Sequence, residues 1–248
     1  MNHPYRRLPL QNMYNFRDIG GYPAEGGVTR YGKFYRSDLP GELPLKDIEA
    51  ILAANVRTVI DFRSDREVEN HPHALRDVAE IDYHRVSLFG DNAQLKEQMG
   101  VDPETSLLSD LGRLYIGFAD FRFEQIVQVF NLLVQAMQKG AVLVNCSAGK
   151  DRTGVISALV LLLCGVPKWD IVADYAITQI LLEPKIRHMV DELNMEVPAA
   201  HYISPPENME RFVDHIAQKF GSAEAYLIGH GFDRTFVDTL IDQMVERV

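Results

Sequence analysis

The chain has 248 residues, of which 46% are hydrophobic and 24% are charged, and its formal net charge is −10. This length and apolar share are sufficient for one large domain with a full core, and the negative charge argues against a general nucleic-acid partner. The two cysteines, Cys146 and Cys164, are too few for a disulfide framework, and a reducing compartment is expected.

No segment of the sequence predicts export or membrane insertion. Residues 1–9 lack the long apolar core of a signal peptide. The longest apolar stretch, residues 155–166, is too short to span a bilayer and is interrupted by Ser157. We therefore expect a cytoplasmic protein without a transmembrane segment, and export without a signal peptide stays open.

The first half of the chain predicts strands that alternate with a helix after a glycine-rich start. Apolar residues at helical spacing predict the helix, and runs rich in β-branched and aromatic residues predict the strands. The polar, turn-rich residues from 90 to about 109 indicate a mobile flap, which we place around residues 90–124. The predicted strands cover residues 33–37, 57–63 and 81–86, and the predicted helix covers residues 45–54.

The second half predicts a central strand at residues 141–144, followed by a loop and an apolar helix. The C-terminal third has a helical pattern throughout. Strands that alternate with helices favour an α/β sandwich with a mostly parallel central sheet flanked by helices, and we expect one domain over residues 1–248. The other predicted helices cover residues 125–137, 168–178, 184–195, 206–220, 222–229 and 233–248.

Residues 145–154, Asn-Cys-Ser-Ala-Gly-Lys-Asp-Arg-Thr-Gly, form what we call the cysteine loop. The apolar runs on both sides, residues 142–144 and 155–163, predict that it joins a strand to a helix. Such a loop turns its backbone N–H groups inward and forms a site for an anion at the positive end of the helix. A cysteine in this site is favoured as thiolate, and an arginine adds a planar fork that suits a phosphoryl group.

The spacing within the cysteine loop predicts phosphoryl transfer to a cysteine. Five residues separate Cys146 from Arg152, so the backbone can curl once around a tetrahedral oxyanion. Cys146 is then in line with the leaving oxygen and forms a phosphocysteine, which water hydrolyses. We expect no metal and no cofactor, because loop dipoles and Arg152 supply the positive charge. The predicted substrate-binding residues are Ser147, Ala148, Gly149, Lys150 and Thr153, of which Thr153 is also placed to donate to the sulfur.

Some of these and of the other polar residues have simpler, structural interpretations. A lone cysteine after a strand is most often a small buried hydrophobe, and this is our interpretation of Cys164. For Cys146, the conjunction with the glycines, Arg152 and Thr153 favours catalysis. The scattered histidines do not suggest a metal site. Three arginines near strand ends are interpreted as structural: Arg17, Arg36 and Arg63, paired with Asp18, Asp38 or Asp65.

The cysteine loop resembles the Cys-x5-Arg loop of the protein tyrosine phosphatase superfamily. Its Ala-Gly-Lys-Asp-Arg-Thr-Gly form is similar to that of bacterial tyrosine phosphatases of broad specificity, of which the mycobacterial tyrosine and phosphoinositide phosphatase is the best-known type. The resemblance implies the fold of that superfamily, a phosphate or other oxyanion in the loop, and a phosphorylated protein or a phosphoinositide as substrate. Further similar segments occur in the expected order at residues 15–21, 35–37, 61–64 and 174–175.

One residue departs from the family pattern, and one role has two candidates. The family usually has His before the cysteine, where this chain has Asn145, which can donate hydrogen bonds but carries no charge. The general acid is expected on a loop after an earlier strand, where Asp91 fits; Asp151 in the cysteine loop is the competitor. Lys150 adds a second basic loop residue, which the resemblance links to inositol phospholipids.

Two other functions stay open at this stage. A catalytically weak pseudophosphatase that binds phosphate groups is suggested by Asn145, although Cys146 and Arg152 are both intact. Sulfur transfer also uses a cysteine in an anion loop, but the rhodanese-type loop usually has a shorter gap between cysteine and arginine. The sequence therefore predicts a cysteine-dependent phosphomonoester hydrolase of the tyrosine phosphatase type and leaves the substrate undetermined.

Overall fold

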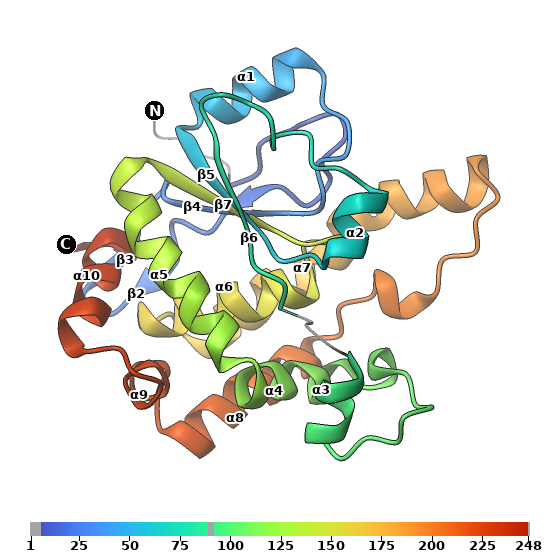
Figure 1. Cartoon of the computed structure of the whole chain (residues 1–248). Helices are drawn as coiled ribbons and strands as arrows, with labels where there is room; N and C mark the ends of the chain where they lie inside the picture. The colour runs from blue at the N-terminus through green and yellow to red at the C-terminus, as the bar shows by residue number, and fades with distance from the viewer. Residues whose placement is uncertain (1–5, 89–91, 248) are drawn as a thin grey trace.

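The structure is a computed structural model of the chain, and it describes residues 6–88 and 92–247 (Figure 1). Its main sheet has five strands in the order β1-β4-β7-β5-β6. The four strands from β4 to β6 are parallel, and β1 pairs antiparallel with β4. These strands confirm the mostly parallel sheet predicted from the sequence. Their bounds are Arg17–Asp18 (β1), Phe34–Ser37 (β4), Ala141–Asn145 (β7), Val56–Asp61 (β5) and Asp82–Arg85 (β6).

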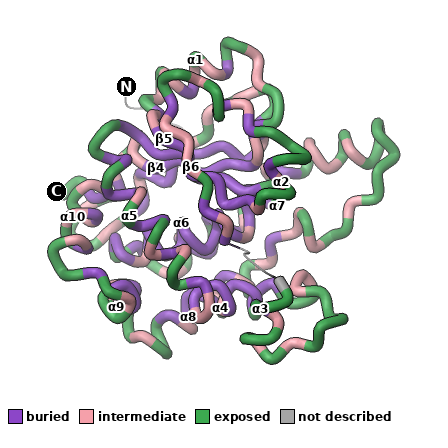
Figure 2. The backbone as a smooth tube through the Cα atoms, viewed as in Figure 1, coloured by how far each residue is buried: buried purple, intermediate pink, exposed green. Residues whose placement is uncertain are grey.

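The central strand β7 separates two hydrophobic layers. Val142 and Val144 face the larger cluster, and Ala141 and Leu143 face the smaller one, as the two-residue period of a strand requires. The smaller cluster is covered by α1 (Leu45–Ala53), and the larger one by α5 (Phe123–Lys139) and α6 (Asp151–Leu163) on the opposite side of the sheet (Figure 1). The strands β1, β4, β5 and β7 and the helix α6 are almost wholly buried, whereas the edge strand β6 is partly exposed (Figure 2). This sandwich brings the carboxyl ends of β4, β5 and β7 to one edge.

A second, three-stranded sheet was not predicted. It consists of β2 (Pro23–Ala24), β3 (Gly27–Thr29) and β8 (Val245–Arg247), in that order. The helix predicted over residues 233–248 is therefore wrong at its end, because α10 (Arg234–Met244) stops and the next residues pair antiparallel with β3. Val245 is buried, and its β-branched side chain suits an extended backbone.

The flap predicted around residues 90–124 is wrong from residue 111 onward. There the chain forms α4 (Leu111–Phe121), whose Leu114, Tyr115 and Phe118 are fully buried against α8 (Pro206–Phe220) and the core. Apolar residues at helical spacing place this segment in the core. The part before it contains α3 (Asn92–Gln98) and a 3₁₀ turn, η1 (Leu107–Ser109). Its mobility stays a prediction, and residues 89–91 lie outside the described part of the chain.

The C-terminal third is helical, as expected, with one long helix in place of two shorter ones. Helix α7 (Lys168–Arg187) continues through Pro184 into a π-helical turn, η2 (His188–Glu192). Residues 179–205 form an arm that projects from the body and returns through η3 (Ala199–His201) (Figure 1). Within the described residues, no helix has both the length and the apolarity to cross a membrane. Two shorter helices complete the fold, α2 (Asp65–Asn70) and α9 (Ala223–Gly229).

Candidate active site

The cysteine loop lies where the sequence placed it, between β7 and α6. Asn145 ends the strand, Cys146 follows it, and α6 begins at Asp151. Cys146 is buried, with 1% of its surface exposed, and lies at the end of a pocket. The first N–H groups of α6 have no partner within the helix, so this end of the helix favours an anion. The strand, loop and helix predicted from local sequence are confirmed.

Two side chains from other strands and loops hold the backbone of the cysteine loop. The Asn15 amide donates to the carbonyls of Ala148 and Gly149, at 2.9 and 3.1 Å, and Arg36 donates to the Gly149 carbonyl at 2.7 Å. Gly149 has φ +64°, and a Cβ there would lie 2.3 Å from the carbonyl oxygen of Ser37. Because these carbonyls are bound from outside, the loop backbone is fixed in a shape that leaves its interior to an anion.

Arg152 is held by a carboxylate that sequence reasoning missed. Its two terminal nitrogens donate to the two oxygens of Glu67, at 2.7 and 2.8 Å. The Ser147 hydroxyl also donates to Glu67, at 2.6 Å. Burial opposes the ionisation of Glu67, but its hydrogen bonds with Arg152 and the arginine's charge hold the pKa of this carboxyl well below its usual value. The sequence does contain one sign of this residue, the pattern Ser64-x-x-Glu67, which is typical of a helix start. In the structure these two side chains form the capping box at the start of α2.

Asp151, the loop carboxylate, lines the pocket and is bound from behind. Its Oδ1 accepts a hydrogen bond from the Tyr115 hydroxyl at 2.5 Å, and the Lys150 ammonium lies 3.6 Å from the same oxygen. Tyr115 in turn is bonded to Tyr175 at 2.8 Å. The other candidate acid, Asp91, lies outside the described residues.

Lys150, predicted to bind substrate, is not among the residues that line the pocket. Its side chain is fully buried, and its ammonium donates to the carbonyls of Ala200 in η3 and of Ile203, the latter at 3.0 Å, where the arm returns to the body. Burial lowers the pKa of Lys150, against the opposing charges of Asp151 and Cys146. The lysine is therefore a link between the cysteine loop and the arm.

Of the other predicted substrate-binding residues, some line the pocket and others are buried behind it. Ser147 and Ala148 line the pocket together with Cys146, Asp151 and Arg152, and Gly149 shapes the loop from behind. The Thr153 hydroxyl is buried without a hydrogen-bond partner among the described residues, so its predicted bond to the sulfur is not formed here. Only the first two of the five predicted substrate-binding residues thus line this pocket.

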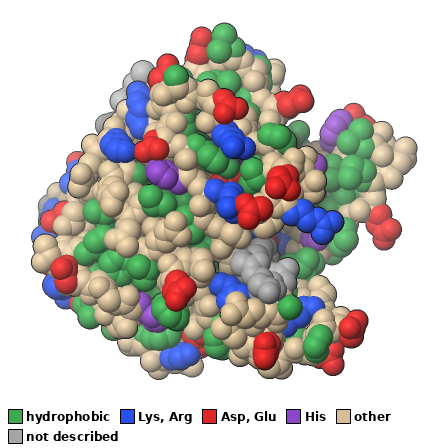
Figure 3. Space-filling view, viewed as in Figure 1, with side chains coloured by type: hydrophobic (Ala, Val, Ile, Leu, Met, Phe, Trp, Pro, Cys, Tyr) green, Lys and Arg blue, Asp and Glu red, His purple; other side chains and the backbone are tan. Residues whose placement is uncertain are grey.

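The pocket has a volume of about 420 Å³ and apolar walls above a polar floor. The arm and η1 supply the walls, and the surface is notched beside the arm in the space-filling view (Figure 3). Lys185 and His201 add two basic side chains of the arm. The floor can hold an anion, while the walls suit a flat or apolar group. The apolar wall residues are Leu108, Leu182, Ile186, Met189 and Val197.

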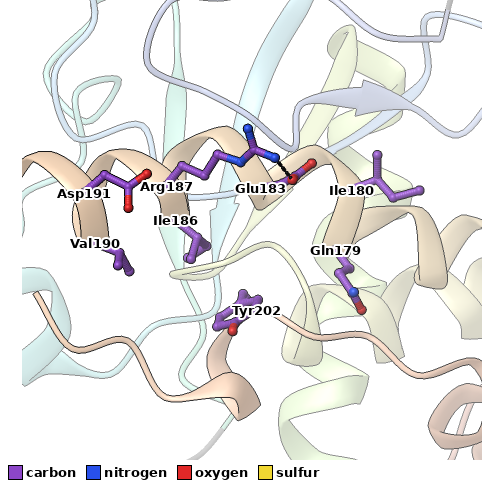
Figure 4. Close-up of a pocket in the computed structure, with 8 residues that line it drawn as sticks. All are labelled: Gln179, Ile180, Glu183, Ile186, Arg187, Val190, Asp191 and Tyr202. Carbon is purple, nitrogen blue, oxygen red and sulfur yellow. Dashed lines mark hydrogen bonds and ion pairs between the residues drawn. The ribbon is translucent and has the colours of Figure 1, made fainter.

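A second groove, of about 510 Å³, lies along α7 and η2 (Figure 4). It is lined by side chains such as Ile180, Val190 and Tyr202, and Glu183 pairs with Arg187 within it at 2.6 Å. It contains no cysteine or other strong nucleophile. Ile186 lines both cavities, so the end of α7 is the wall between them.

Asn145, which stands where the family usually has His, contacts a histidine from elsewhere in the chain. Its Oδ1 lies 3.3 Å from Nε2 of the buried His73, whose Nδ1 accepts from the N–H of Leu75 at 3.1 Å. The proton of neutral His73 is therefore on Nε2, which donates to Asn145. Burial lowers the pKa of His73 to about 4, so the ring is uncharged at neutral pH.

The three arginines near strand ends are structural, as interpreted, but their predicted partners are wrong. Arg17 and Arg36 both bind Asp174 of α7, at 2.9 and 2.5 Å, and Arg63 binds Asp61 at 2.6 Å. Burial opposes the charge of Asp174, but the two arginines hold its pKa well below the usual value. The expected partners were neighbours in sequence, whereas Asp174 is a neighbour in space.

The loop at the carboxyl edge of the parallel sheet has a buried cysteine at one end and an arginine at the other, and a helix begins within it. This arrangement is that of the cysteine-loop class of phosphatases. The chain belongs to the tyrosine phosphatase family, whose family model matches residues 8–246. This confirms the resemblance found in the sequence. The described residues contain no group of three or more His, Cys, Asp or Glu side chains that could hold a metal ion.

Individual relatives carry the same family name. A tyrosine-protein phosphatase of Nostoc commune is 40% identical over 151 residues, which are 60% of this chain and 49% of that protein. A Cupriavidus necator protein named for the same activity is 30% identical over 172 residues, 68% of this chain and 61% of that protein. The matched stretches thus span about half to three fifths of these relatives. The crystal structure of P. aeruginosa TpbA aligns with 97% of both chains at 16% identity, with a TM-score of 0.41.

Proposed function

We propose that the protein is a cysteine-dependent phosphomonoester hydrolase that acts on phosphotyrosine. The observation that carries the proposal is the pocket itself, in which Cys146 and Arg152 share a floor with the N-terminus of α6. Arg36, Lys150 and Arg152 all interact electrostatically with Cys146. Positive charge on several sides of the loop favours a bound phosphate.

The reaction has two steps at phosphorus. The sulfur of Cys146 attacks, the bond from phosphorus to the ester oxygen breaks, and an acid transfers a proton to the leaving oxygen. Water then attacks the phosphocysteine, the bond from phosphorus to sulfur breaks, and a carboxylate accepts the proton of the water. Arg152 and the loop N–H groups bind the phosphoryl oxygens in both steps. We assign the proton transfers to Asp151, and Asp91 is the competing candidate.

The walls of the pocket support an aromatic phosphate ester as substrate. Leu182, Ile186 and Met189 project from one arm over the floor, and an aryl ring placed between apolar side chains buries its surface there. A phosphoinositide is the second candidate, favoured by Lys185 and His201 at the same pocket. The ratio of kcat/KM between a phosphotyrosine peptide and a phosphoinositide measures which substrate is preferred.

Replacement of the nucleophile tests the proposal. Cys146→Ser is expected to abolish hydrolysis of p-nitrophenyl phosphate, whereas Cys164→Ser keeps it, because burial raises the pKa of Cys164 to about 12 and leaves it an inert thiol. Vanadate is expected to inhibit the unaltered protein. Turnover that survives in Cys146→Ser would contradict a cysteine mechanism. Phosphate binding without turnover would indicate the pseudophosphatase, and thiosulfate–cyanide transfer would indicate the sulfurtransferase.

A further inference from the structure

A chain of hydrogen-bonded side chains from two helices ends on Asp151. Tyr115 of α4 contacts Asp151 at 2.5 Å and Tyr175 of α7 at 2.8 Å. The two tyrosines are 0% and 1% exposed, and their rings pack edge to face at 78°. Side chains of α4, α6 and α7 are therefore joined at one carboxylate.

The direction of the protons along this chain follows from the donors available. A carboxylate only accepts, so Tyr115 donates its one hydroxyl proton to Oδ1 of Asp151. The oxygen of Tyr115 is then free to accept the hydroxyl proton of Tyr175. Burial, and then the charge of Asp151, raise the pKa of Tyr115 well above its usual value, so the donor is present at every working pH.

The two oxygens of Asp151 are consequently not equivalent. Oδ1 is occupied from the protein side, by Tyr115 and by the nearby Lys150 ammonium. Oδ2 accepts no hydrogen bond from the described residues, and Asp151 lines the pocket beside Cys146. A carboxyl that is fixed at one oxygen carries its transferable proton on the other.

We propose that Tyr115, supported by Tyr175, is a positioning residue that holds Asp151 with Oδ2 toward the bound ester. This inference rests on the proposed function, in which Asp151 transfers protons. Rotation of the carboxylate about its side-chain bonds would take Oδ2 away from the leaving oxygen, and a small loss of alignment is costly in a proton transfer. The phenol chain prevents that rotation without contacting the substrate itself.

The test is the dependence of kcat/KM on the pKa of the leaving phenol, measured with a series of aryl phosphates. Tyr115→Phe is expected to lower kcat/KM about tenfold for the poorest leaving group and less than about twofold for the best, since good leaving groups need no acid. Tyr175→Phe keeps the bond between Tyr115 and Asp151 and is expected to give the same pattern with a smaller loss. It also provides the readout if Tyr115→Phe does not fold.

A matched control is available on α9, which packs next to α4 through the hydroxyl of Tyr226. Tyr226→Phe removes another fully buried hydroxyl, which donates to the carbonyl of Ala119 at 2.9 Å, and is expected to leave the leaving-group dependence unchanged. In the Asp151→Asn background, Tyr115→Phe should cause no further loss, because its effect is exerted through Asp151.

Three results would overturn the inference. An equal loss for all leaving groups in Tyr115→Phe would indicate a purely structural phenol. A full additional loss in the double variant would place the effect of Tyr115 elsewhere. If Asp151→Asn does not change the leaving-group dependence while Cys146→Ser is inactive, the cysteine mechanism holds but the role of Asp151 is wrong, and the inference fails with it.

Discussion

Glu67 of α2 accepts two hydrogen bonds from Arg152 at the far end of the cysteine loop, at 2.7 and 2.8 Å. The two residues are 85 positions apart in the chain, yet the guanidinium and the carboxylate form a bidentate ion pair. The same carboxylate caps the start of α2 and accepts from Ser147. It therefore fixes the guanidinium that the proposed mechanism uses to bind phosphate.

We expect Glu67→Ala to impair both stability and turnover. Loss of the capping box costs about 1 kcal/mol, and a guanidinium without its carboxylate no longer has one orientation, so kcat/KM is expected to fall about tenfold. Chemical denaturation and the hydrolysis of p-nitrophenyl phosphate measure the two effects. Glu69→Ala, an exposed change on the same helix, is the control. Unchanged kcat/KM in Glu67→Ala would contradict a role in positioning Arg152.

Lys150→Met is expected to loosen the arm rather than to weaken one class of substrate. The ammonium binds the carbonyls of Ala200 and Ile203 and does not line the pocket. Limited proteolysis within the arm should therefore become faster, while kcat/KM for phosphotyrosine and phosphoinositide substrates changes by the same factor. Lys46→Met, in the exposed first turn of α1, is the control. A selective loss for phosphoinositides would return Lys150 to the substrate-binding residues.

His73 is expected to make the fold sensitive to acid. Its pKa is about 4 in the folded protein against an ordinary 6.5, so the unfolded state binds the proton more tightly. The stabilising contribution is complete above pH 6.5 and is lost as the pH falls toward 4, by roughly 3 kcal/mol in all. His73→Gln keeps a donor toward Asn145 but does not titrate, so its stability should fall less over this range.

Denaturant unfolding at several pH values between 7 and 4 measures this difference, with His71→Gln as the control. His71 is exposed and two residues away, so its replacement is expected to leave the pH dependence unchanged. Equal acid sensitivity of His73→Gln and the unaltered protein would contradict the assignment.

The sequence predicted those parts of the site that are close together in the chain. Cys146, Arg152 and the strand and helix around them form one continuous segment, whose apolar runs and spacing are visible without a structure. Glu67 and Tyr115 contact the loop from positions that are distant in the sequence, and neither their residue type nor the periodicity around them predicts such a contact. The partners of Arg17 and Arg36 were misassigned for the same reason, since a buried charge pairs by position in space.

The fold was predictable where elements are long and periodic. The four parallel strands of the main sheet and most of the long helices were found, whereas β1, β2, β3 and β8 were not, because strands of two or three residues show no alternation. The helix α4 was missed because the flap predicted from the polar residues before it was continued to residue 124, although residues 111–121 have apolar side chains at helical spacing. Two helices were predicted where α7 is one, and α7 continues through Pro184 with Ile180, four residues earlier, exposed to solvent.

The small sheet makes a prediction about Gly27, which pairs with Arg247 across the two strands. A Cβ at residue 27 would lie 2.0 Å from the carbonyl oxygen of Glu246, a backbone atom that cannot move aside without breaking the pairing. Gly27→Ala is therefore expected to lower the free energy of unfolding by about 2 kcal/mol, as overpacking commonly does. Gly41→Ala, where a Cβ would meet no atom within 4 Å, is the matched control. Thermal unfolding compares the two variants, and kcat/KM should stay unchanged in both, because the small sheet contributes no residue to the pocket. Equal stability of the two variants would show that the C-terminal strand does not pair with β3 in solution.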